Sequence, residues 1–218
     1  MTYESVNILE GEMEQQNRRQ KKKMQLKEAA LQLFATNGYE NTKVSEIVKH
    51  VQVSQGTFYW YFQSKEECAL EMLDDGGEQL LNSIKQGYRV EKFEVEDALK
   101  STKSIFGQIF NFAQDNRYLM QIILRGIHTQ PILQAKVNSI KQHMEQAFAR
   151  NIVRAKELGV LKQEVNEQFH AVLIVSLIEG VLIRWLDDDE ASQFKDISIE
   201  QLIDQTANFE FYGLFGQQ

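Results

Sequence analysis

Polar and aromatic side chains share one short stretch of the chain, residues 55–61, in a pattern suited to contacting the edges of nucleic-acid bases. At helical spacing Phe58, Tyr61 and Phe62 fall on one face, and the other residues lie on or near the opposite face. Aromatic side chains normally bury most of their area, so an exposed Tyr and Trp on so short a helix indicate a partner surface. Amide and hydroxyl groups bond base edges, and apolar atoms contact thymine methyls. The residues expected to contact bases are Gln55, Thr57, Tyr59 and Trp60.

Two short helices are predicted to position these side chains. Apolar residues recur at i, i+3, i+4 and i+7 from Val44 to Val51, which is the stripe of an amphipathic helix. Ser54 is a suitable N-cap for the next helix, and Val53 and Phe58 have the spacing of a hydrophobic staple. Two helices joined by so short a turn form a helix-turn-helix, whose second helix usually enters the major groove of DNA.

The segment VSQGTFYWYFQSKEE resembles the recognition helix and following turn of the TetR/AcrR family of bacterial transcriptional regulators. Upstream, ALQLFATNGYENTKVSEIV resembles the family's first helix and its link to the second. The similarity runs without gaps from about Leu26 to Glu67, and the remainder resembles the family in length and helical pattern only. Gln52 stands where the turn usually has Gly, so we expect left-handed backbone there. Gln55 replaces the usual Lys, and Trp60 replaces the common His.

Charge is distributed unevenly along the chain, whose net charge is −7. Residues 17–65 contain nine Lys and Arg against three Asp and Glu, whereas residues 66–218 contain 15 against 24. A basic N-terminal part followed by an acidic remainder suits a protein that contacts phosphate groups at one end only. The alternative is that the basic residues simply form a solvated helix end. The residues expected to contact phosphates are Arg18, Arg19, Thr42, Lys43, Tyr61 and Lys65.

The chain is predicted to be all-α, with about nine helices in two domains. Residues 1–16 are acidic with little apolar periodicity, and we expect a mobile leader there. Residues 17–65 are expected to form a three-helix helix-turn-helix DNA-binding domain, and residues 66–218 a helical effector-binding and dimerisation domain. A long helix is predicted from Lys65 to about Gly87, in which Gly76-Gly77 marks a kink or a close helix crossing.

Composition excludes several other classes of protein. The single Cys precludes an internal disulfide, and the N-terminus has no apolar segment typical of a secretory signal. The longest charge-free apolar run, Ala171 to Ile178, is far shorter than the roughly 20 residues that span a bilayer, so we expect a soluble cytoplasmic protein. The sequence has no Gly-rich phosphate loop after a strand and no Cys/His cluster with metal spacing. We therefore expect no enzyme activity, no cofactor and no metal.

An apolar cavity with a few polar groups is predicted between the helices of the second domain, because small-molecule sites are usually built in this way. The alternative is that these side chains fill a closed core. The residues expected to line the effector pocket are Phe106, Phe110, Arg117, Tyr118, Met120, Ile123, Leu124, His128, Met144, Phe148, Phe169, Leu173 and Leu177.

The helix that starts near Asn166 is apolar nearly all round from Ala171 to Leu186. Such a helix must be covered on every side, and a second subunit is the natural cover. The family resemblance implies a four-helix dimer interface made by the last two helices of each subunit, whereas the alternative is the central helix of a monomer core. The residues expected at the interface are Leu177, Gly180, Val181, Arg184, Leu202 and Phe209.

The leading hypothesis is a homodimeric TetR-like repressor that binds a palindromic operator in double-stranded DNA. A small apolar or amphipathic effector in the second domain would release it. The alternative is a helical ligand-binding or protein-interaction module that has lost specific DNA binding. Gln52 and Gln55, which depart from the family pattern, favour this alternative.

Overall fold

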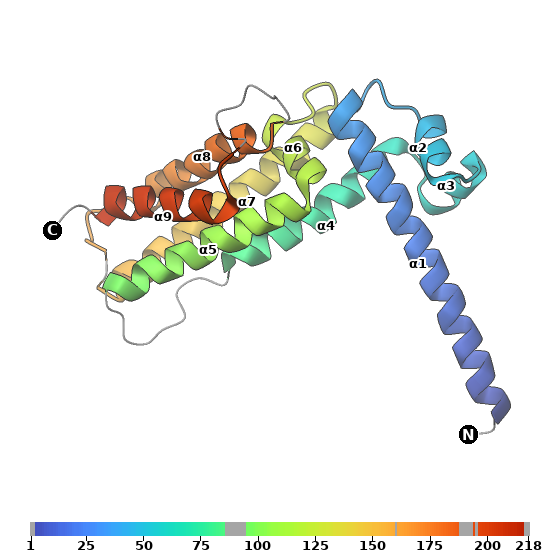
Figure 1. Ribbon diagram of the computed structural model, residues 1–218, viewed down its shortest axis with the longest axis horizontal. Helices are drawn as coiled ribbons and strands as arrows, with labels where there is room; N and C mark the ends of the chain where they lie inside the picture. The colour runs from blue at the N-terminus through green and yellow to red at the C-terminus, as the bar shows by residue number, and fades with distance from the viewer. Residues whose placement is uncertain (1–2, 86–94, 160, 188–193, 195, 216–218) are drawn as a thin grey trace. The chain divides into compact units, whose positions relative to one another are not determined.

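The computed structural model describes residues 3–85, 95–159, 161–187, 194 and 196–215, and within these ranges it contains nine α-helices and no strand (Figure 1). The predicted all-α class is therefore confirmed. The chain divides into two compact units, Met1–Met72 and Leu73–Gln218, and the division falls within the fourth helix. We call these the head unit and the body unit.

The head unit contains α1 (Tyr3–Asn37), α2 (Val44–Val51), α3 (Gln55–Tyr61) and the first turns of α4 (Lys65–Lys85). Helix α2 packs against both α1 and α3. The apolar faces of these helices meet in one core, because the side chains at their helical spacings all point inward. Its fully or almost fully buried members include Leu26, Ala30, Phe34, Ile47, Phe58 and Phe62.

Helix α1 begins at Tyr3, so residues 3–16, which include most of the predicted leader, are helical. The segment is rich in Glu and Gln, both good helix formers, and an ion pair between Glu14 and Arg18 at 3.0 Å joins successive turns. The side chains from residue 13 to residue 20 are all exposed. This part of α1 therefore projects beyond the head core rather than packing into it.

The turn between α2 and α3 is set by Gln52, whose φ of 59° and ψ of 48° lie in the left-handed region. Among the described non-glycine residues it alone has positive φ. The backbone N–H groups of Gln52 and Val53 bond back to the carbonyl oxygens of Lys49 and Val48 at 3.2 and 3.0 Å, which satisfies the end of α2. The expected left-handed backbone is confirmed.

Side-chain caps fix where the helices of the head begin. Ser54 Oγ accepts a hydrogen bond from the Thr57 N–H at 3.2 Å, and Ser64 Oγ accepts one from the Glu67 N–H at 3.0 Å. Helix α2 is capped by Lys43, whose backbone N–H donates to Glu46 Oε2 at 2.7 Å. These caps hold α3 at a defined angle to α2.

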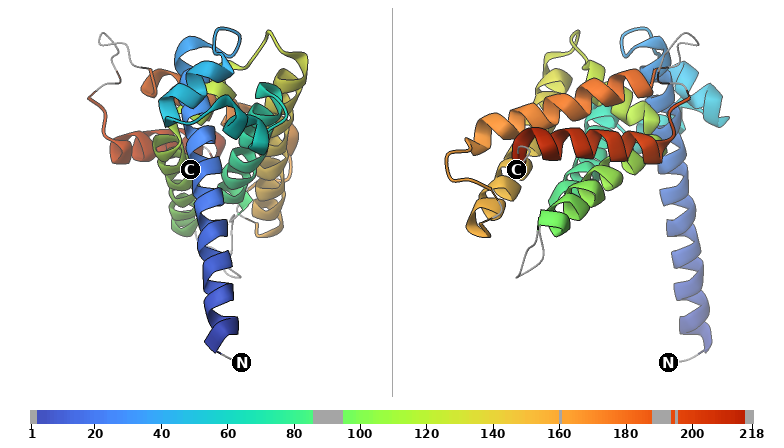
Figure 2. Two further views of the ribbon diagram at one scale, coloured as in Figure 1. Left: turned by 90° about the vertical axis from the view of Figure 1, so that its right-hand side faces the viewer. Right: turned by 60° about the vertical axis from the view of Figure 1, so that its left-hand side comes forward.

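The body unit contains the rest of α4 with α5 (Val95–Asp115), α6 (Arg117–Arg125), α7 (Pro131–Glu157), α8 (Glu167–Trp185) and α9 (Ile199–Phe215). Helices α7 and α8 lie side by side, as do α5 and α9, while α6 packs on α5 and α8 (Figure 2). Pro131 occupies the first turn of α7, where its missing N–H costs no helix hydrogen bond. The predicted end of α4 at Gly87 lies outside the described residues.

The two glycines of α4 allow neighbouring helices of the body to approach closely. A Cβ on Gly76 would overlap with Leu119 of α6, and one on Gly77 would lie 2.9 Å from Ile140 of α7. Helix α4 continues through both residues. Of the two predicted possibilities, the glycines therefore mark a close crossing.

Helix α8 is the one described helix that is long and apolar enough, by length and composition, to cross a membrane. A helix that packs against protein on several sides has the same composition. In the single chain only 28% of its apolar window is buried. Much of the apolar surface of α8 is thus left uncovered by the body unit.

Candidate nucleic-acid interface

The outward face of α3 carries the aromatic side chains that the sequence singled out. Tyr59 and Trp60 are 53% and 62% exposed, whereas Phe58 is fully buried and Phe62 almost so. The Phe58 and Phe62 rings pack at 5.3 Å between centroids and anchor the helix to the head core. Tyr59 and Trp60 therefore point into solvent from a helix whose other face is held, as a base-contacting role requires.

The two smaller residues predicted to contact bases, Gln55 and Thr57, differ in exposure and in hydrogen bonding. Gln55 is exposed in the first turn of α3 and faces solvent next to Gly56. Thr57 is half-buried, and its hydroxyl hydrogen-bonds with Ser54 Oγ at 3.0 Å. The Thr57 hydroxyl is thus shared with the helix cap, while the Gln55 side chain extends into solvent.

A groove of about 700 Å³ lies between α1 and α3, on the side of the exposed Trp60. The Arg19 guanidinium stacks over the Trp60 ring at 5.5 Å, and the Trp60 and Tyr61 rings meet edge to face at 4.5 Å. All of its lining residues are neutral or basic, which suits an anionic backbone: Gln15, Gln16, Arg19, Gln20, Lys23, Trp60 and Tyr61. The three glutamines were missed because residues 1–16 were expected to be a mobile leader and Gln20 belongs to no recognised motif.

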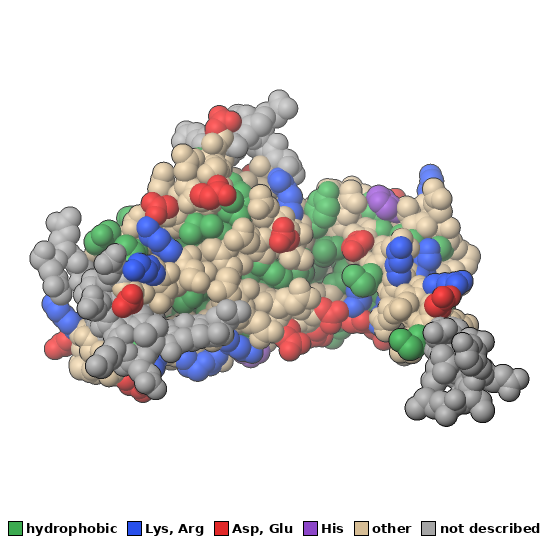
Figure 3. All heavy atoms as spheres, turned by 60° about the horizontal axis from the view of Figure 1, so that its bottom comes forward, with side chains coloured by type: hydrophobic (Ala, Val, Ile, Leu, Met, Phe, Trp, Pro, Cys, Tyr) green, Lys and Arg blue, Asp and Glu red, His purple; other side chains and the backbone are tan. Residues whose placement is uncertain are grey.

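The basic residues of α1 divide into an outward and an inward set. Lys23 and Lys27 bind Glu71 of α4 at 2.7 and 2.5 Å, and Lys23 also lies 5.3 Å from the Phe62 ring centroid. Burial raises the pKa of Glu71, but hydrogen bonds from the two lysines outweigh it and leave the pKa lowered. Arg18 is exposed and pairs with Glu14 of its own helix at 3.0 Å. On the face shown in Figure 3, several Lys and Arg side chains are exposed on the unit that carries α1, and others are exposed on the body unit.

Lys65 has an intramolecular role that the sequence did not predict. Its ammonium donates to the carbonyl oxygens of Tyr39 and Thr42 at 2.7 and 2.9 Å, and it lies 4.0 Å from the Tyr39 ring centroid. Burial lowers the pKa of Lys65. Two of its three N–H donors are used to hold α4 against the turn between α1 and α2, where we had expected a phosphate contact.

Thr42 cannot contact a phosphate in this structure, which corrects the prediction. The residue is 1% exposed, and its hydroxyl lies 2.9 Å from the Gly38 carbonyl and 3.1 Å from that of Leu33. Its buried hydroxyl stabilises the turn after α1 by hydrogen bonding to the backbone. Lys43, the next residue, is exposed and remains available.

The predicted effector-pocket residues fall into three groups in the body unit. Phe106, Phe110, Met120, Ile123, Met144 and Phe148 are buried in the core. Arg117, Tyr118, Leu124 and Leu177 are half-buried, and the Arg117 guanidinium donates to the Leu186 carbonyl at the end of α8. The remaining three, His128, Phe169 and Leu173, are exposed and do not line an interior space.

One small cavity of about 20 Å³ lies inside the body unit. Of the predicted pocket residues, only Phe106 and Phe148 line it. Sequence reasoning missed the others, which are Thr102, Ile105, Asn151, Ile152, Leu161, Ile174 and Glu210. Glu210 sits in an otherwise aromatic and apolar stretch of α9, and nothing in its local pattern marks it as a pocket residue.

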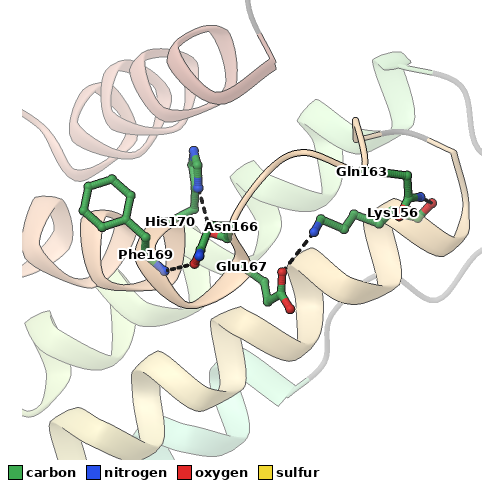
Figure 4. A network of polar contacts seen from close by, with 6 residues as sticks. All are labelled: Lys156, Gln163, Asn166, Glu167, Phe169 and His170. Atoms are coloured by element: carbon green, nitrogen blue, oxygen red, sulfur yellow. Dashed lines mark hydrogen bonds and ion pairs between the residues drawn. The ribbon is translucent and has the colours of Figure 1, made fainter.

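Phe169 is held outward by the polar contacts that begin α8 (Figure 4). Asn166 Oδ1 accepts a hydrogen bond from the Phe169 N–H at 2.8 Å, and Lys156 of α7 pairs with Glu167 at 2.9 Å. The His170 ring bonds the Asn166 carbonyl at 2.8 Å. Figure 4 shows the Phe169 ring turned away from the Lys156–Glu167 pair, so the cap and the ion pair fix which face of α8 meets α7.

Apolar side chains on α8 and α9 are left exposed in the single chain. The set comprises Phe169, Val172, Leu173, Ile183, Phe209 and Tyr212. Of the predicted interface residues, Phe209 is 71% exposed and Arg184 is exposed, and Leu177, Gly180 and Val181 are half-buried. Leu202 is only 4% exposed, so it belongs to the body core and not to a free face, contrary to the prediction.

Comparison with known proteins supports this description of the head and of the fold. Residues 26–72 match the family model described as "Bacterial regulatory proteins, tetR family". An uncharacterised helix-turn-helix transcriptional regulator of Bacillus subtilis, YdgC, is 27% identical over 154 residues, which is 71% of this chain and 75% of the relative. The fatty acid metabolism regulator of the same organism is 23% identical over 169 residues, covering 78% of this chain and 86% of the relative.

The fold of the whole chain has a counterpart among solved structures. The transcriptional regulator FadR from Bacillus subtilis, solved in complex with stearoyl-CoA, superposes with a TM-score of 0.68 over 87% of this chain and 98% of its own, at 20% identity. This likeness concerns the fold, whereas the head match concerns the helix-turn-helix itself. Tyr59 and Trp60 are turned outward from that motif, so the chain is a DNA-binding transcriptional regulator whose head matches the helix-turn-helix of the TetR family.

Proposed function

We propose that the protein represses transcription as a homodimer, bound to a palindromic operator and released by a small apolar or amphipathic effector. The observation that carries the proposal is the outward display of Tyr59 and Trp60 on a capped helix beside a neutral and basic groove. A repressor needs no chemistry of its own, and the relatives are transcriptional regulators. Since its target is DNA, the expected location is the cytoplasm.

On the operator, α3 would lie in the major groove. Gln55, Thr57, Tyr59 and Trp60 would contact base edges or thymine methyls. Arg18, Arg19, Lys43 and Tyr61 would contact phosphates, with the Arg19–Trp60 stack holding both side chains in place before DNA arrives. The part of α1 before Arg18 would follow the duplex backbone, because its exposed glutamines line the same groove.

The dimer would form through the exposed apolar face of α8 and α9. Helices α8 and α9 contact each other, and both expose large apolar side chains that a second copy of the chain could cover. These side chains are Leu173 and Ile183 of α8 and Phe209 and Tyr212 of α9. A two-fold axis presents two α3 helices in opposite directions, which is why the operator must be palindromic.

The effector would bind within the body unit and favour the state in which the two heads no longer match the half-sites. An effector shifts the equilibrium only by its difference in affinity for the two states. Helix α4 belongs to both units, so it is the candidate element for this coupling. A related regulator was solved with stearoyl-CoA, so long-chain acyl thioesters are one effector class to test.

The experiment is a selection of bound sequences from a random duplex library, followed by sedimentation of the complex. We expect enrichment of an inverted repeat with half-sites about one helical turn apart or somewhat more, bound by an even number of chains. Enrichment of a single half-site by one chain would contradict the dimer, and no enrichment at all would contradict the operator.

A further inference from the structure

Glu210 is half-buried, and one of its carboxylate oxygens has nothing to bind within the described chain. It lies on α9, its Oε2 atom is shielded from solvent, and within the described chain this oxygen has no hydrogen-bond partner. It lines the small cavity of the body unit. A buried polar group without a partner destabilises a fold, so an apolar residue would be the more stable choice here.

The walls of the cavity are aromatic and aliphatic. The Phe106 ring meets those of Phe148 and Phe110 at 6.5 and 6.1 Å between centroids, the first pair edge to face. Besides Glu210, the polar lining residues are neutral: Thr102 and Asn151. Asn151 already donates to the Ile84 carbonyl at 3.3 Å, so its amide is turned toward the backbone.

Two lysines of the body unit are engaged elsewhere. Lys103 of α5 pairs with Asp204, and Lys156 of α7 pairs with Glu167. Burial alone raises the pKa of Glu210 to about 7. The carboxyl group therefore exchanges its proton near neutral pH and lacks a fixed counter-ion within the described body unit.

A carboxylate beside phenyl rings in an apolar enclosure is the combination that recognises organic cations, since a cation gains from both the charge and the ring faces. We propose that Glu210 is the anchor for a protonated amine carried on an apolar body, with Phe106 and Phe148 as its aromatic walls. The ligand would be the effector of the proposed repressor, so this assignment rests on that function.

The present cavity is closed around its anchor. Its volume of about 20 Å³ corresponds to about one water molecule, so an amine would have to displace side chains to enter. Such a displacement gives the ligand a preference for one state of the body, which release of DNA requires. The acyl chain of stearoyl-CoA ends in a methyl group and offers no donor to Glu210, so the two effector classes are distinguishable.

The test uses three probes of one shape, 4-phenylbutylamine, 4-phenylbutan-1-ol and 4-phenylbutanoate, titrated calorimetrically into the full-length protein. We expect the amine to bind at least about tenfold more tightly than the alcohol, the size typical of a charge-assisted hydrogen bond. Glu210→Gln should remove this preference, whereas Glu200→Gln, a change of an exposed carboxylate on the same helix, should keep it.

Equal affinity of the wild-type protein for amine and alcohol would overturn the proposal, whether or not the Glu210→Gln variant folds. So would an amine preference that survives in Glu210→Gln, or tightest binding of the carboxylate, which would mean that Glu210 acts as a protonated donor. Operator binding is measured separately without probe. Absence of operator binding would contradict the proposed repressor function. The preference for the amine is measured without DNA, so the two outcomes are independent.

Discussion

Lys65 in the head unit and Glu210 in the body unit are both charged groups withdrawn from water, and they end in opposite situations. The Lys65 ammonium finds two carbonyl oxygens and an aromatic ring. Glu210 Oε2 finds no partner in the described chain. The charged group of the head is therefore hydrogen-bonded within the chain and keeps the head rigid. The body instead has an unsatisfied carboxylate oxygen, which a bound ligand would satisfy.

The largest effect is expected from Lys65→Met, which keeps most of the length of the side chain and removes its charge. The carbonyl oxygens of Tyr39 and Thr42 would each lose the ammonium donor, so the head should be destabilised by about 2 kcal/mol. Hydrogen exchange resolves this by region, because amides of α2 and α3 should lose protection while those of α7 and α8 keep it.

The same variant separates the structural role of Lys65 from the phosphate contact first expected of it. At salt and temperature where the head stays folded, Lys65→Met should leave the salt dependence of DNA binding nearly unchanged. A slope lowered by about one unit with normal exchange protection would restore the phosphate contact.

Glu210→Gln should show the opposite kind of effect, a gain in stability near neutral pH. The folded-state pKa of about 7 lies above the ordinary value of 4.5, so the native state holds its proton more tightly than the unfolded chain. The contribution of the Glu210 carboxyl group to the free energy of unfolding is fully present below pH 4.5 and is lost as the pH rises through about 7. The wild-type protein should lose on the order of 2 kcal/mol across this window relative to Glu210→Gln.

Urea unfolding of the body at pH 5 and pH 8 measures this difference, with Glu200→Gln as the matched exposed control. Parallel pH profiles for the wild-type protein and Glu210→Gln would show that the carboxyl group is not held in an unfavourable setting. The contrast with Lys65 would then disappear.

Much of the head could be predicted from the sequence because its signals are local. The cap at Ser54 and the left-handed Gln52 each depend on residues within four positions. The outward direction of Tyr59 and Trp60 follows from helical spacing once Phe58 is placed inside.

The errors concern partners that are distant in sequence. Lys65 bonds carbonyls 23 and 26 residues away, and the Thr42 hydroxyl bonds a carbonyl nine residues away, so neither role has a local pattern. Helix α8 is apolar on almost every side, so periodicity could not tell whether Phe169 faces the core or solvent. Glu210 gave no signal, because its neighbours on α9 are aromatic and its cavity is formed by four other segments.

A moderate effect is expected from Phe209→Asp on the exposed face of α9. Loss of one large apolar contact from the proposed interface should weaken self-association by about 1.5 kcal/mol, which sedimentation velocity detects as a shift toward monomer. Ile132→Asp on α7 also replaces an exposed apolar residue and should leave the association unchanged. Equal effects of both changes would place the dimer contact elsewhere.

The smallest effect is expected from Arg19→Ala. Removing one phosphate contact should lower the slope of log affinity against log salt by about one unit and weaken all sequences alike. The Lys27→Met variant is the matched control, since Lys27 is committed to Glu71 and should not change the slope. A change in sequence preference instead would mean that Arg19 acts mainly through its stack on Trp60.

The central claim is that the outward face of α3 reads DNA, and an anisotropy titration of Trp60→Ala tests it most directly. The wild-type protein and the variant would each be titrated with the selected operator and with a scrambled duplex of equal length. We predict that the variant loses on the order of 1–3 kcal/mol of preference for the operator, with little change on the scrambled duplex. An unchanged preference, or an equal loss on both duplexes, would contradict the account.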